Sequence, residues 1–279
     1  MQSKLGILYV VATPIGNLQD ITFRALEVLK GVDRILAEDT RHSGLLLKHF
    51  SISKPLLSLH DFNESQQLKN VIQSLQSGES LALVSDAGTP LISDPGYLLI
   101  KEAKACGIQV IPIPGPCAAI TALSAAGLPT DKFVFEGFLS SKSVARSQQL
   151  KTLLTETRTM IFYEAPHRLI QLLQALNEEL GGNRMACIAR ELTKIHESIT
   201  TDSLSSLLTH FKTHPSEERG EFVIIVAGAE ESGTSAIYSA KQVLHILLAE
   251  LPLKQAVKLA HEITGERKNI LYKMGLEFK

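Results

Sequence analysis

The sequence predicts an α/β protein with two successive α/β units, followed by a small helical region. Strand-like apolar runs alternate with helical patterns from residue 6 to residue 126. This alternation is typical of a largely parallel sheet with helices on its faces. A second series of strands and helices follows residue 131. A chain of 279 residues is long enough for two such units, each with its own core.

Five short apolar runs, each ending in a turn, predict the strands of the first unit. They are residues 6–12, 33–37, 55–59, 80–84 and 109–113. The segments between and after them have helical character, and we expect helices over residues 22–29, 43–50, 63–76, 95–105 and 117–126. Gly31 is placed to end the first of these helices, and Pro95 to begin the fourth.

The loop after the fourth strand is the stretch around which this unit is organised. Residues 84–95 read VSDAGTPLISDP, and Gly and Pro at this density set a fixed, tightly turned backbone. Parallel strands expose their C-terminal loops at one edge of the sheet, which is where open α/β sheets bind ligands. We therefore expect three Gly/Pro-rich loops, residues 13–17, 86–96 and 112–116, to line one crevice.

Residues 127–131, GLPTD, mark the boundary to the second unit. Its expected strands are residues 133–136, 159–163, 185–189, 197–201 and 222–227. Its expected helices are residues 145–154, 167–180 and 203–210. Several of the strand-like runs alternate between apolar and polar residues, so the sheet is expected to be mixed.

The C-terminal region is expected to be a small basic helix-turn-helix appendage after a linker rich in Gly, Ser and Thr. One helical face is predicted from Ala256, Leu259, Ala260 and Ile263. Gly265 breaks this helix, and a second one follows around Ile270, Leu271 and Met274. The appendage is a candidate RNA or ribosome contact, with dimer packing or capping as the alternative.

Composition narrows the class of protein. The net charge of −1 gives no global sign of a nucleic-acid binder, although a local basic patch can suffice. The three cysteines are widely spaced, without a CxxC pair, which argues against a structural zinc site and a disulfide framework. A reducing cytoplasm is the simplest setting. The N-terminal apolar run is too short for a signal peptide, and no stretch is long enough to span a membrane.

Common nucleotide-binding and hydrolase motifs are missing. The first loop, TPIGN, is not a GxGxxG motif, and Pro14 offers no N–H to a pyrophosphate, which argues against NAD or FAD. The sequence also contains no GxxxxGK[ST] phosphate-binding loop and no GxSxG serine.

Charged residues at strand ends are candidate site groups, and each also has an ordinary structural explanation. Residues 38–42, EDTRH, can form ion pairs in a solvated loop. Asp86 and Asp94 can hold a metal, a cation or a ribose hydroxyl, or can cap Asx turns. His167 and Arg168 lie at a helix start, where the dipole disfavours cations. That position favours a functional role, with a salt bridge to Glu164 as the alternative.

Together these segments resemble the tetrapyrrole methylase-type (class III) S-adenosylmethionine methyltransferases over essentially the whole chain. More specifically, the chain resembles the branch that methylates a ribose 2′-hydroxyl in small-subunit ribosomal RNA. The motifs that carry the resemblance are ATPIGNL (12–18), AEDTR (37–41), VSDAGTPLISDPG (84–96), PGP (114–116), FEGF (135–138), FYEAPHR (162–168), RELTK (190–194) and GE (220–221). Precorrin and uroporphyrinogen methylases usually carry Gly-Asp-Pro where this chain has Gly88-Thr-Pro90.

The resemblance implies two α/β domains with the methyl donor, S-adenosylmethionine, in the cleft between them. We expect the domains at residues 1–118 and 119–230, a linker at 231–240 and the small basic helical region at 241–279. The resemblance also implies a homodimer, a cytoplasmic setting, no metal and no membrane. The implied substrate is the ribose of a cytidine in the decoding region of 16S ribosomal RNA, in an assembled small subunit.

Site residues are assigned by the same resemblance. The expected donor-binding residues are Pro14, Asp86, Gly88, Thr89, Ile92, Ser93, Cys117, Ala118, Tyr163, Ala189 and Glu221. A ribose hydroxyl is a poor nucleophile, so a general base or charge partner is expected, from among Glu191, Asp94, His167 and Lys194. The expected RNA contacts are Arg41, Arg168, Arg190 and Lys268.

Two other functions are compatible with the sequence. The first is a methyltransferase acting on a tetrapyrrole, and the second is a non-catalytic S-adenosylmethionine-binding module that assists ribosome assembly. Salt dependence separates an RNA substrate from a small one, because each neutralised phosphate of a single strand contributes about −0.7 to the log–log salt slope.

Overall fold

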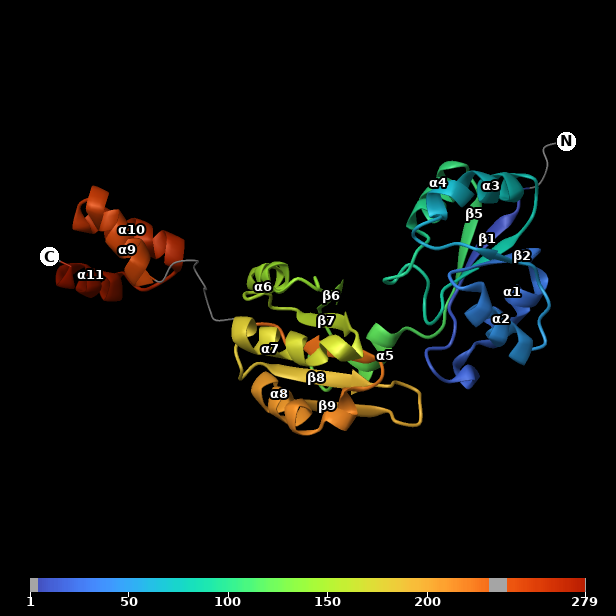
Figure 1. Cartoon of the computed structure of the whole chain (residues 1–279). Helices are drawn as coiled ribbons and strands as arrows, with labels where there is room; N and C mark the ends of the chain where they lie inside the picture. The colour runs from blue at the N-terminus through green and yellow to red at the C-terminus, as the bar shows by residue number, and fades with distance from the viewer. Residues whose placement is uncertain (1–4, 231–239, 279) are drawn as a thin grey trace. The chain divides into compact units, whose positions relative to one another are not determined.

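The computed structural model describes residues 5–230 and 240–278, which form two compact units (Figure 1). The first unit comprises residues 5–154 and 158–227 and contains two β-sheets with their helices. The second comprises residues 155–157, 228–230 and 240–278 and is helical. The expected division at residue 118 therefore separates two sheets within one unit. Among the described helices, none combines the length and apolar character needed to cross a bilayer.

The first sheet is five-stranded and parallel, with the order β3-β2-β4-β1-β5. This confirms the predicted parallel arrangement. Its strands are β1 (Ile7–Val11), β2 (Arg34–Ala37), β3 (Leu56–Ser58), β4 (Leu81–Val84) and β5 (Gln109–Ile113). The central strand β4 is buried along its whole length, as expected for a strand with helices on both faces.

Helices cover both faces of this sheet. Helices α1 (Phe23–Gly31) and α2 (Thr40–His49) pack on the face that includes Ile35. Helices α3 (Glu64–Gln76) and α4 (Tyr97–Ala105) pack on the face that includes Leu36, because successive strand residues point to opposite sides. A short 3₁₀ turn, η1 (Leu18–Asp20), precedes α1.

Helix α4 begins later than predicted. It starts at Tyr97 rather than Pro95, because Gly96 occupies the N-cap position with φ of +123°. A Cβ at Gly96 would also lie 2.7 Å from Cδ2 of Leu83, so the chain turns sharply over β4 at this point. The buried carboxylate of Glu64 accepts a hydrogen bond from the backbone N–H of Leu99, at 2.9 Å, and so caps this start.

The second sheet is also five-stranded, with the order β6-β7-β10-β8-β9. Its strands are β6 (Phe133–Phe138), β7 (Thr159–Glu164), β8 (Met185–Arg190), β9 (Ser198–Ser203) and β10 (Phe222–Val226). Only the pairing of β6 with β7 is parallel among the described strands of this sheet, which confirms the predicted mixed sheet. Strand β6 ends at Phe138, two residues beyond its predicted end, and its pairing with β7 has a register shift between Phe135 and Gly137.

The two faces of the second sheet have different partners. Helices α6 (Ser143–Thr152), α7 (Leu169–Leu180) and α8 (Leu204–Thr213) cover one face, with Phe162 at its centre. Helix α5 (Ala118–Ala125) packs on the other face, together with Ile15 from the first loop. Side chains at alternate positions therefore point either to the helical core or toward the first sheet's loops.

Two predicted helices of this half are displaced along the chain. The helix expected over residues 145–154 is α6, two residues earlier. The helix expected from residue 167 begins at Leu169, because the 3₁₀ turn η2 (Pro166–Arg168) precedes it. Another 3₁₀ turn, η3 (Pro215–Glu218), follows α8.

The second unit contains three described helices, α9 (Ala240–Glu250), α10 (Leu253–Thr264) and α11 (Lys268–Glu277). The first was not predicted, and the expected linker falls largely on residues 231–239, outside the described residues. The predicted face of α10 is partly wrong, since Leu259 and Ile263 are exposed while Ala256, Val257 and Ala260 form the core. The break at Gly265 is confirmed by its left-handed φ of +71°.

Candidate active site

Three loops meet at the carboxyl edge of the first sheet, as predicted. Thr13 and Gly88 form an antiparallel bridge, with Thr13 N–H donating to Gly88 O at 2.8 Å and Gly88 N–H donating to Thr13 O at 3.1 Å. Thr89 Oγ1 donates to Pro116 O at 3.0 Å, which ties the central loop to the loop after β5. The central loop, residues 86–96, is thus held from both sides.

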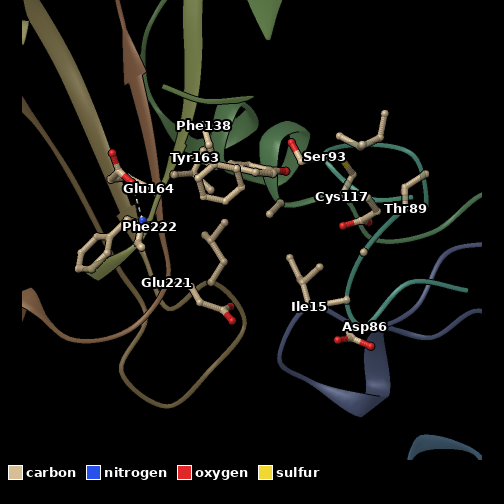
Figure 2. A pocket seen from close by; sticks show the side chains of 18 of the residues that line it. Ile15, Asp86, Thr89, Ser93, Cys117, Phe138, Tyr163, Glu164, Glu221 and Phe222 are labelled. Atoms are coloured by element: carbon tan, nitrogen blue, oxygen red, sulfur yellow. Dashed lines mark hydrogen bonds between the residues drawn. The ribbon is translucent and has the colours of Figure 1, made fainter. Parts of the chain in front are cut away.

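A cavity of about 450 Å³ lies between these loops and the second sheet. This volume suits a ligand of nucleoside size. From the first sheet's edge it is lined by Ile15, Glu38, Asp86, Ala87, Gly88, Thr89, Ile92, Ser93, Asp94, Cys117 and Ala118. From the second half it is lined by Phe138, Tyr163, Glu164, Ala165, Pro166, Ala189, Leu192, Glu221, Phe222 and Val223. Figure 2 shows Ile15, Asp86 and Thr89 on one side and Tyr163 and Phe138 on the other.

The wall from the second sheet is aromatic and apolar. Tyr163 packs edge-on against Phe135 and Phe138, with ring centroids 4.9 and 5.7 Å away. Its hydroxyl oxygen accepts a hydrogen bond from the backbone N–H of Ala119, in the first turn of α5, at 3.0 Å. Burial raises the pKa of Tyr163, so the phenol stays neutral and holds α5 in place.

The wall from the first sheet is acidic. Glu38 follows β2, Asp86 follows β4, and Asp94 lies in the central loop. The backbone N–H of Asp39 donates to Oδ1 of Asp86 at 3.1 Å, which joins the two strand ends. Burial raises the pKa of Asp94 to about 6, and the charges of nearby carboxylates add to this effect. A hydrogen bond from Ser85 acts in the opposite direction. Burial also raises the pKa of Glu38, and the charge of Asp86 adds to that effect.

The central loop has an unusual backbone. Leu91 and Ser93 have left-handed φ values of 72° and 70°, which non-glycine residues rarely adopt. Such conformations persist where the surrounding structure enforces them, and they are concentrated at functional sites. The same loop is held at Gly88 by the bridge to Thr13 and at Thr89 by the hydrogen bond to Pro116.

The turn after β8, residues 191–194, packs directly on the first loop. A Cβ at Gly16 would lie 2.6 Å from Cγ of Lys194, so only glycine fits there. Oε1 of Glu191 accepts hydrogen bonds from Nζ of Lys194 at 2.8 Å and from the backbone N–H of Glu221 at 2.9 Å. Although burial opposes it, these hydrogen bonds lower the pKa of Glu191. Glu191 is therefore a weak base that holds the turn together.

Glu164 and Arg168 form a buried ion pair behind the aromatic wall. Nε of Arg168 lies 3.1 Å from Oε1 of Glu164, whose side chain is fully buried. Another guanidinium nitrogen, Nη2 of Arg168, donates to Leu139 O at 2.7 Å. Glu164 also lines the cavity, and its Oε1 accepts a hydrogen bond from the backbone N–H of Ala165 at 2.9 Å.

Most of the expected donor-binding residues line this one cavity. Ten of the eleven line it directly: Asp86, Gly88, Thr89, Ile92, Ser93, Cys117, Ala118, Tyr163, Ala189 and Glu221. Pro14 is buried beside it in the first loop, where Ile15 supplies the lining side chain. Their role in donor binding remains a prediction.

Unlike the expected donor-binding residues, the expected catalytic and RNA-binding residues do not gather at one cavity. Among the catalytic candidates Asp94 lines the cavity, whereas Glu191 and Lys194 form the turn behind it and His167 is exposed in η2. Among the RNA candidates, Arg168 is occupied by Glu164. Arg41 is 89% exposed and pairs with Asp39, Arg190 Nε donates to Arg219 O, and Lys268 begins α11.

Sequence reasoning missed Glu38 and Ile15 as cavity residues. The local sequence fits a solvated loop at Glu38, although its position directly after a parallel strand is a signal for the ligand-binding edge of the sheet. Ile15 carried no local signal, because its contact is with the second sheet. The described residues contain no group of three or more His, Cys, Asp or Glu side chains arranged to hold a metal ion.

Comparison with known proteins defines the class. Residues 7–208 match the family model of the tetrapyrrole (corrin/porphyrin) methylases. The chain belongs to this family of methyltransferases. Residues 238–279 match a second model, described as the RsmI C-terminal HTH domain.

Within that family, the chain is similar over nearly its whole length to proteins named ribosomal RNA small subunit methyltransferase I. The relative from Escherichia coli O157:H7 is 53% identical over 272 residues, covering 98% of this chain and 95% of the relative. The relative from Pseudomonas aeruginosa (strain PAO1) is 53% identical over 274 residues, covering 98% and 97%.

Solved structures share the fold at low identity. The uroporphyrin-III-C-methyltransferase from Thermus thermophilus matches with a TM-score of 0.56 at 20% identity, over 80% of this chain and 94% of that one. A diphthine synthase matches with a TM-score of 0.60 at 15% identity, over 80% and 90%. These matches confirm the predicted tetrapyrrole methylase fold.

Proposed function

We propose that this protein transfers a methyl group from S-adenosylmethionine to the 2′-hydroxyl of a cytidine in the decoding region of 16S ribosomal RNA. The observation that carries the proposal is the 53% identity, over 98% of the chain, to proteins named ribosomal RNA small subunit methyltransferase I. The motifs TPIGN and EDTR, which distinguish this branch, lie at the cavity edge.

The cavity fits the proposed donor. Its aromatic and apolar wall, with Tyr163 and Phe138, suits an adenine ring, and its acidic wall, with Asp86 and Asp94, suits the cationic end of the donor. The donor would supply a sulfonium-activated methyl group. The protein's part is to orient donor and acceptor, because an in-line displacement depends strongly on alignment.

Asp94 is the catalytic candidate that the geometry favours. It lines the cavity, and its raised pKa of about 6 makes it a stronger base than an ordinary aspartate while leaving it largely ionised at neutral pH. We propose that it accepts the proton of the ribose hydroxyl. Glu191 and Lys194 then act as positioning residues, since both bind Glu221, the residue directly before β10, and hold it at the cavity wall.

RNA recognition is proposed to use exposed cations rather than Arg168. Arg41 lies beside the acidic wall, on α2, and its guanidinium is 89% exposed. In the second unit, α11 exposes Lys268, Asn269, Tyr272 and Lys273. A helix that presents cations, an amide and an aromatic ring fits single-stranded or loop RNA.

A homodimer in the cytoplasm with the assembled small subunit as partner completes the proposal. Light scattering of the purified protein would measure the oligomeric state. Binding to purified small subunits, with and without residues 240–279, would measure the contribution of the appendage. We expect its deletion to weaken subunit binding more than donor binding.

The experiment that tests the function is transfer of tritium from labelled S-adenosylmethionine. Small ribosomal subunits, naked 16S ribosomal RNA and a porphyrinogen serve as parallel acceptors. Label in subunit RNA, with one linkage resistant to alkali, is the expected result. Label only in the porphyrinogen would support the tetrapyrrole alternative, and donor binding without transfer to any acceptor would support the non-catalytic module.

Two variants sharpen this experiment. Asp94→Asn removes the proposed base and should reduce transfer at saturating donor and acceptor by about 10²-fold or more. Glu27→Gln changes an exposed acid on α1, outside the cavity lining, and should leave transfer unchanged. Full activity of the Asp94→Asn variant would remove Asp94 as the base without affecting the proposed reaction.

A further inference from the structure

The charge of the cavity lining is entirely of one sign. Glu38, Asp86 and Asp94 face it from the first sheet's edge, and Glu164 and Glu221 contribute from the second half. None of the described residues that line the cavity is Lys, Arg or His. A ligand that enters this space therefore meets carboxylates without competing cations.

The five carboxylates divide into paired and unpaired groups. Glu221 lies 3.1 Å from the ammonium of Lys194, and Glu164 pairs with Arg168 behind the wall. No ion pair with a cation is found for Glu38, Asp86 or Asp94 within the described parts of the chain. The unpaired negative charge is thus confined to the acidic wall, defined as Glu38, Asp86 and Asp94.

The proposed reaction changes the charge of the ligand in this cavity. S-adenosylmethionine carries a positive sulfonium, whereas its product, S-adenosylhomocysteine, has a neutral thioether and is otherwise nearly the same size and shape. Shape and hydrogen bonding cannot separate two such ligands strongly, but an unpaired negative charge in a partly buried cavity can.

We propose that the acidic wall, with Glu38 as its newly assigned member, selects the sulfonium donor over the neutral thioether product and so favours product release. This inference rests on the proposed function, because it takes S-adenosylmethionine as the donor. The wall acts through charge at several ångströms, so Glu38 is a specificity-determining residue without a bond to the reacting atoms.

The raised pKa values of Asp94 and Glu38 agree with their clustering in the acidic wall. Burial, and then the charges of neighbouring carboxylates, hold the pKa of Asp94 near 6 and that of Glu38 above its ordinary value. A bound cation relieves this repulsion and favours the ionised forms, so donor affinity should rise with pH through about pH 6. The titratable and charged groups that face the wall from neighbouring elements are Asp39, Arg41, His60, Asp61, Cys117 and Tyr163.

Those neighbours do not cancel the wall's charge. Arg41 is paired with Asp39 and its side chain is 89% exposed, so solvent and its own partner screen it. Asp61 adds negative charge, since it raises the pKa of both Glu38 and Asp94. His60 lies near Glu38 and favours the ionised form of that carboxylate.

The test is calorimetric binding of S-adenosylmethionine and S-adenosylhomocysteine to the full chain between pH 5 and pH 8. At pH 8 we expect the donor to bind about tenfold more tightly than the product, as opposite charges at an effective dielectric of ~20 allow. The ratio should shrink toward equality near pH 5, because product affinity should change little. Equal affinities at pH 8, or a ratio independent of pH, would overturn the proposal.

Variants locate the effect. Glu38→Gln should reduce the donor-to-product affinity ratio by about threefold to tenfold with little change in product affinity. Glu27→Gln is the matched control and should leave the ratio unchanged. Asp86→Asn provides a second test if Glu38→Gln does not fold, as judged by circular dichroism, because its amide oxygen can still accept the Asp39 N–H. An unchanged ratio in a folded wall variant contradicts the proposal.

The outcome separates this inference from the proposed function. Methyl transfer to subunit RNA with equal binding of donor and product would leave the reaction intact and reject charge selection. Tight binding of the donor, weak binding of the product and no transfer to RNA would support charge selection and reject the reaction. Added Mg²⁺ serves as a further probe, and competition by millimolar Mg²⁺ at constant ionic strength would reject selection for the sulfonium in favour of a metal.

Discussion

The ammonium of Lys194 lies 3.1 Å from Oε2 of Glu221, a residue that lines the cavity. The same ammonium lies 2.8 Å from Oε1 of Glu191, so one cation bridges the end of β8 and the start of β10. The stem of Lys194 packs on Gly16. Lys194 thus connects the second sheet, the first loop and the cavity wall. This structural role accounts for a lysine at position 194 without a role in the methyl transfer.

Replacing Lys194 by Met should weaken donor binding without slowing the chemical step. A partly exposed ion pair contributes about 0.2–1 kcal/mol, so donor affinity should fall by no more than about fivefold. Single-turnover transfer at saturating donor, with small subunits as acceptor, should stay within about twofold of the unmodified protein. A loss of single-turnover rate by two orders of magnitude would instead place Lys194 among the catalytic groups.

Glu191 makes stability depend on pH in a defined direction. Its pKa is lowered in the folded state, so its contribution is present above the ordinary glutamate pKa of about 4.3 and is lost as the pH falls through the folded value. The unmodified protein should therefore exceed Glu191→Gln in free energy of unfolding most at neutral pH. The difference should begin to shrink as the pH falls through about 4.3 and should vanish only below the lowered folded-state pKa. Urea unfolding at several pH values measures it, and a difference that grows toward acid would contradict the assignment.

Local pattern was sufficient for the parallel sheet and for the loops at its edge. Apolar runs such as β4 are buried on both faces, and their carboxyl ends meet whatever the details of the helices. The meeting of the three loops follows from that topology, although residues 112–116 hold the central loop through Pro116 and are not among the residues that line the cavity. The position of Asp86 at the cavity could therefore be predicted from the end of a strand.

Contacts between distant segments could not be predicted in the same way. The ion pair that occupies Arg168 depends on the burial of Glu164 at the end of β7, and the local sequence pattern offers that salt bridge only as one of two alternatives. The late start of α4 depends on the space above Leu83. Likewise Leu259 and Ile263 fit a helical face by spacing, but packing among α9, α10 and α11 selects the neighbouring face.

Tyr163 should support both stability and donor binding through its hydroxyl. Tyr163→Phe leaves the backbone N–H of Ala119 buried without its acceptor, which costs about 1–3 kcal/mol of unfolding free energy. Donor affinity should fall as well, because the first turn of α5 lines the cavity. Tyr97→Phe is the matched control, since Tyr97 is 67% exposed, and it should change neither quantity. Equal effects of the two substitutions in urea unfolding and calorimetry would argue against this role.

Substitutions of Arg168 and Arg41, both predicted RNA contacts, should have very different effects on the free energy of unfolding. Arg168→Met leaves the fully buried carboxylate of Glu164 unpaired and should cost about 3–5 kcal/mol of unfolding free energy. The double variant Glu164→Gln/Arg168→Met should recover part of that loss. Arg41→Met should change stability by less than about 0.5 kcal/mol, because its guanidinium is 89% exposed.

Binding of small subunits should be weakened more by Arg41→Met than by Arg168→Met, the opposite of their order in stability. Arg41→Met should weaken binding of small subunits and reduce the log–log salt slope by about 0.7, as expected for one lost phosphate contact. Arg168→Met, measured at a temperature where the variant remains folded, should keep the full salt slope. In the unmodified protein the Arg168 guanidinium is held by Glu164 and Leu139 and makes no phosphate contact that the variant could lose. A reduced slope in Arg168→Met with normal stability would mean that this arginine leaves its buried partner to bind RNA. The buried ion pair makes that exchange unfavourable, since Glu164 would then lose its ion-pair partner while its side chain stays buried.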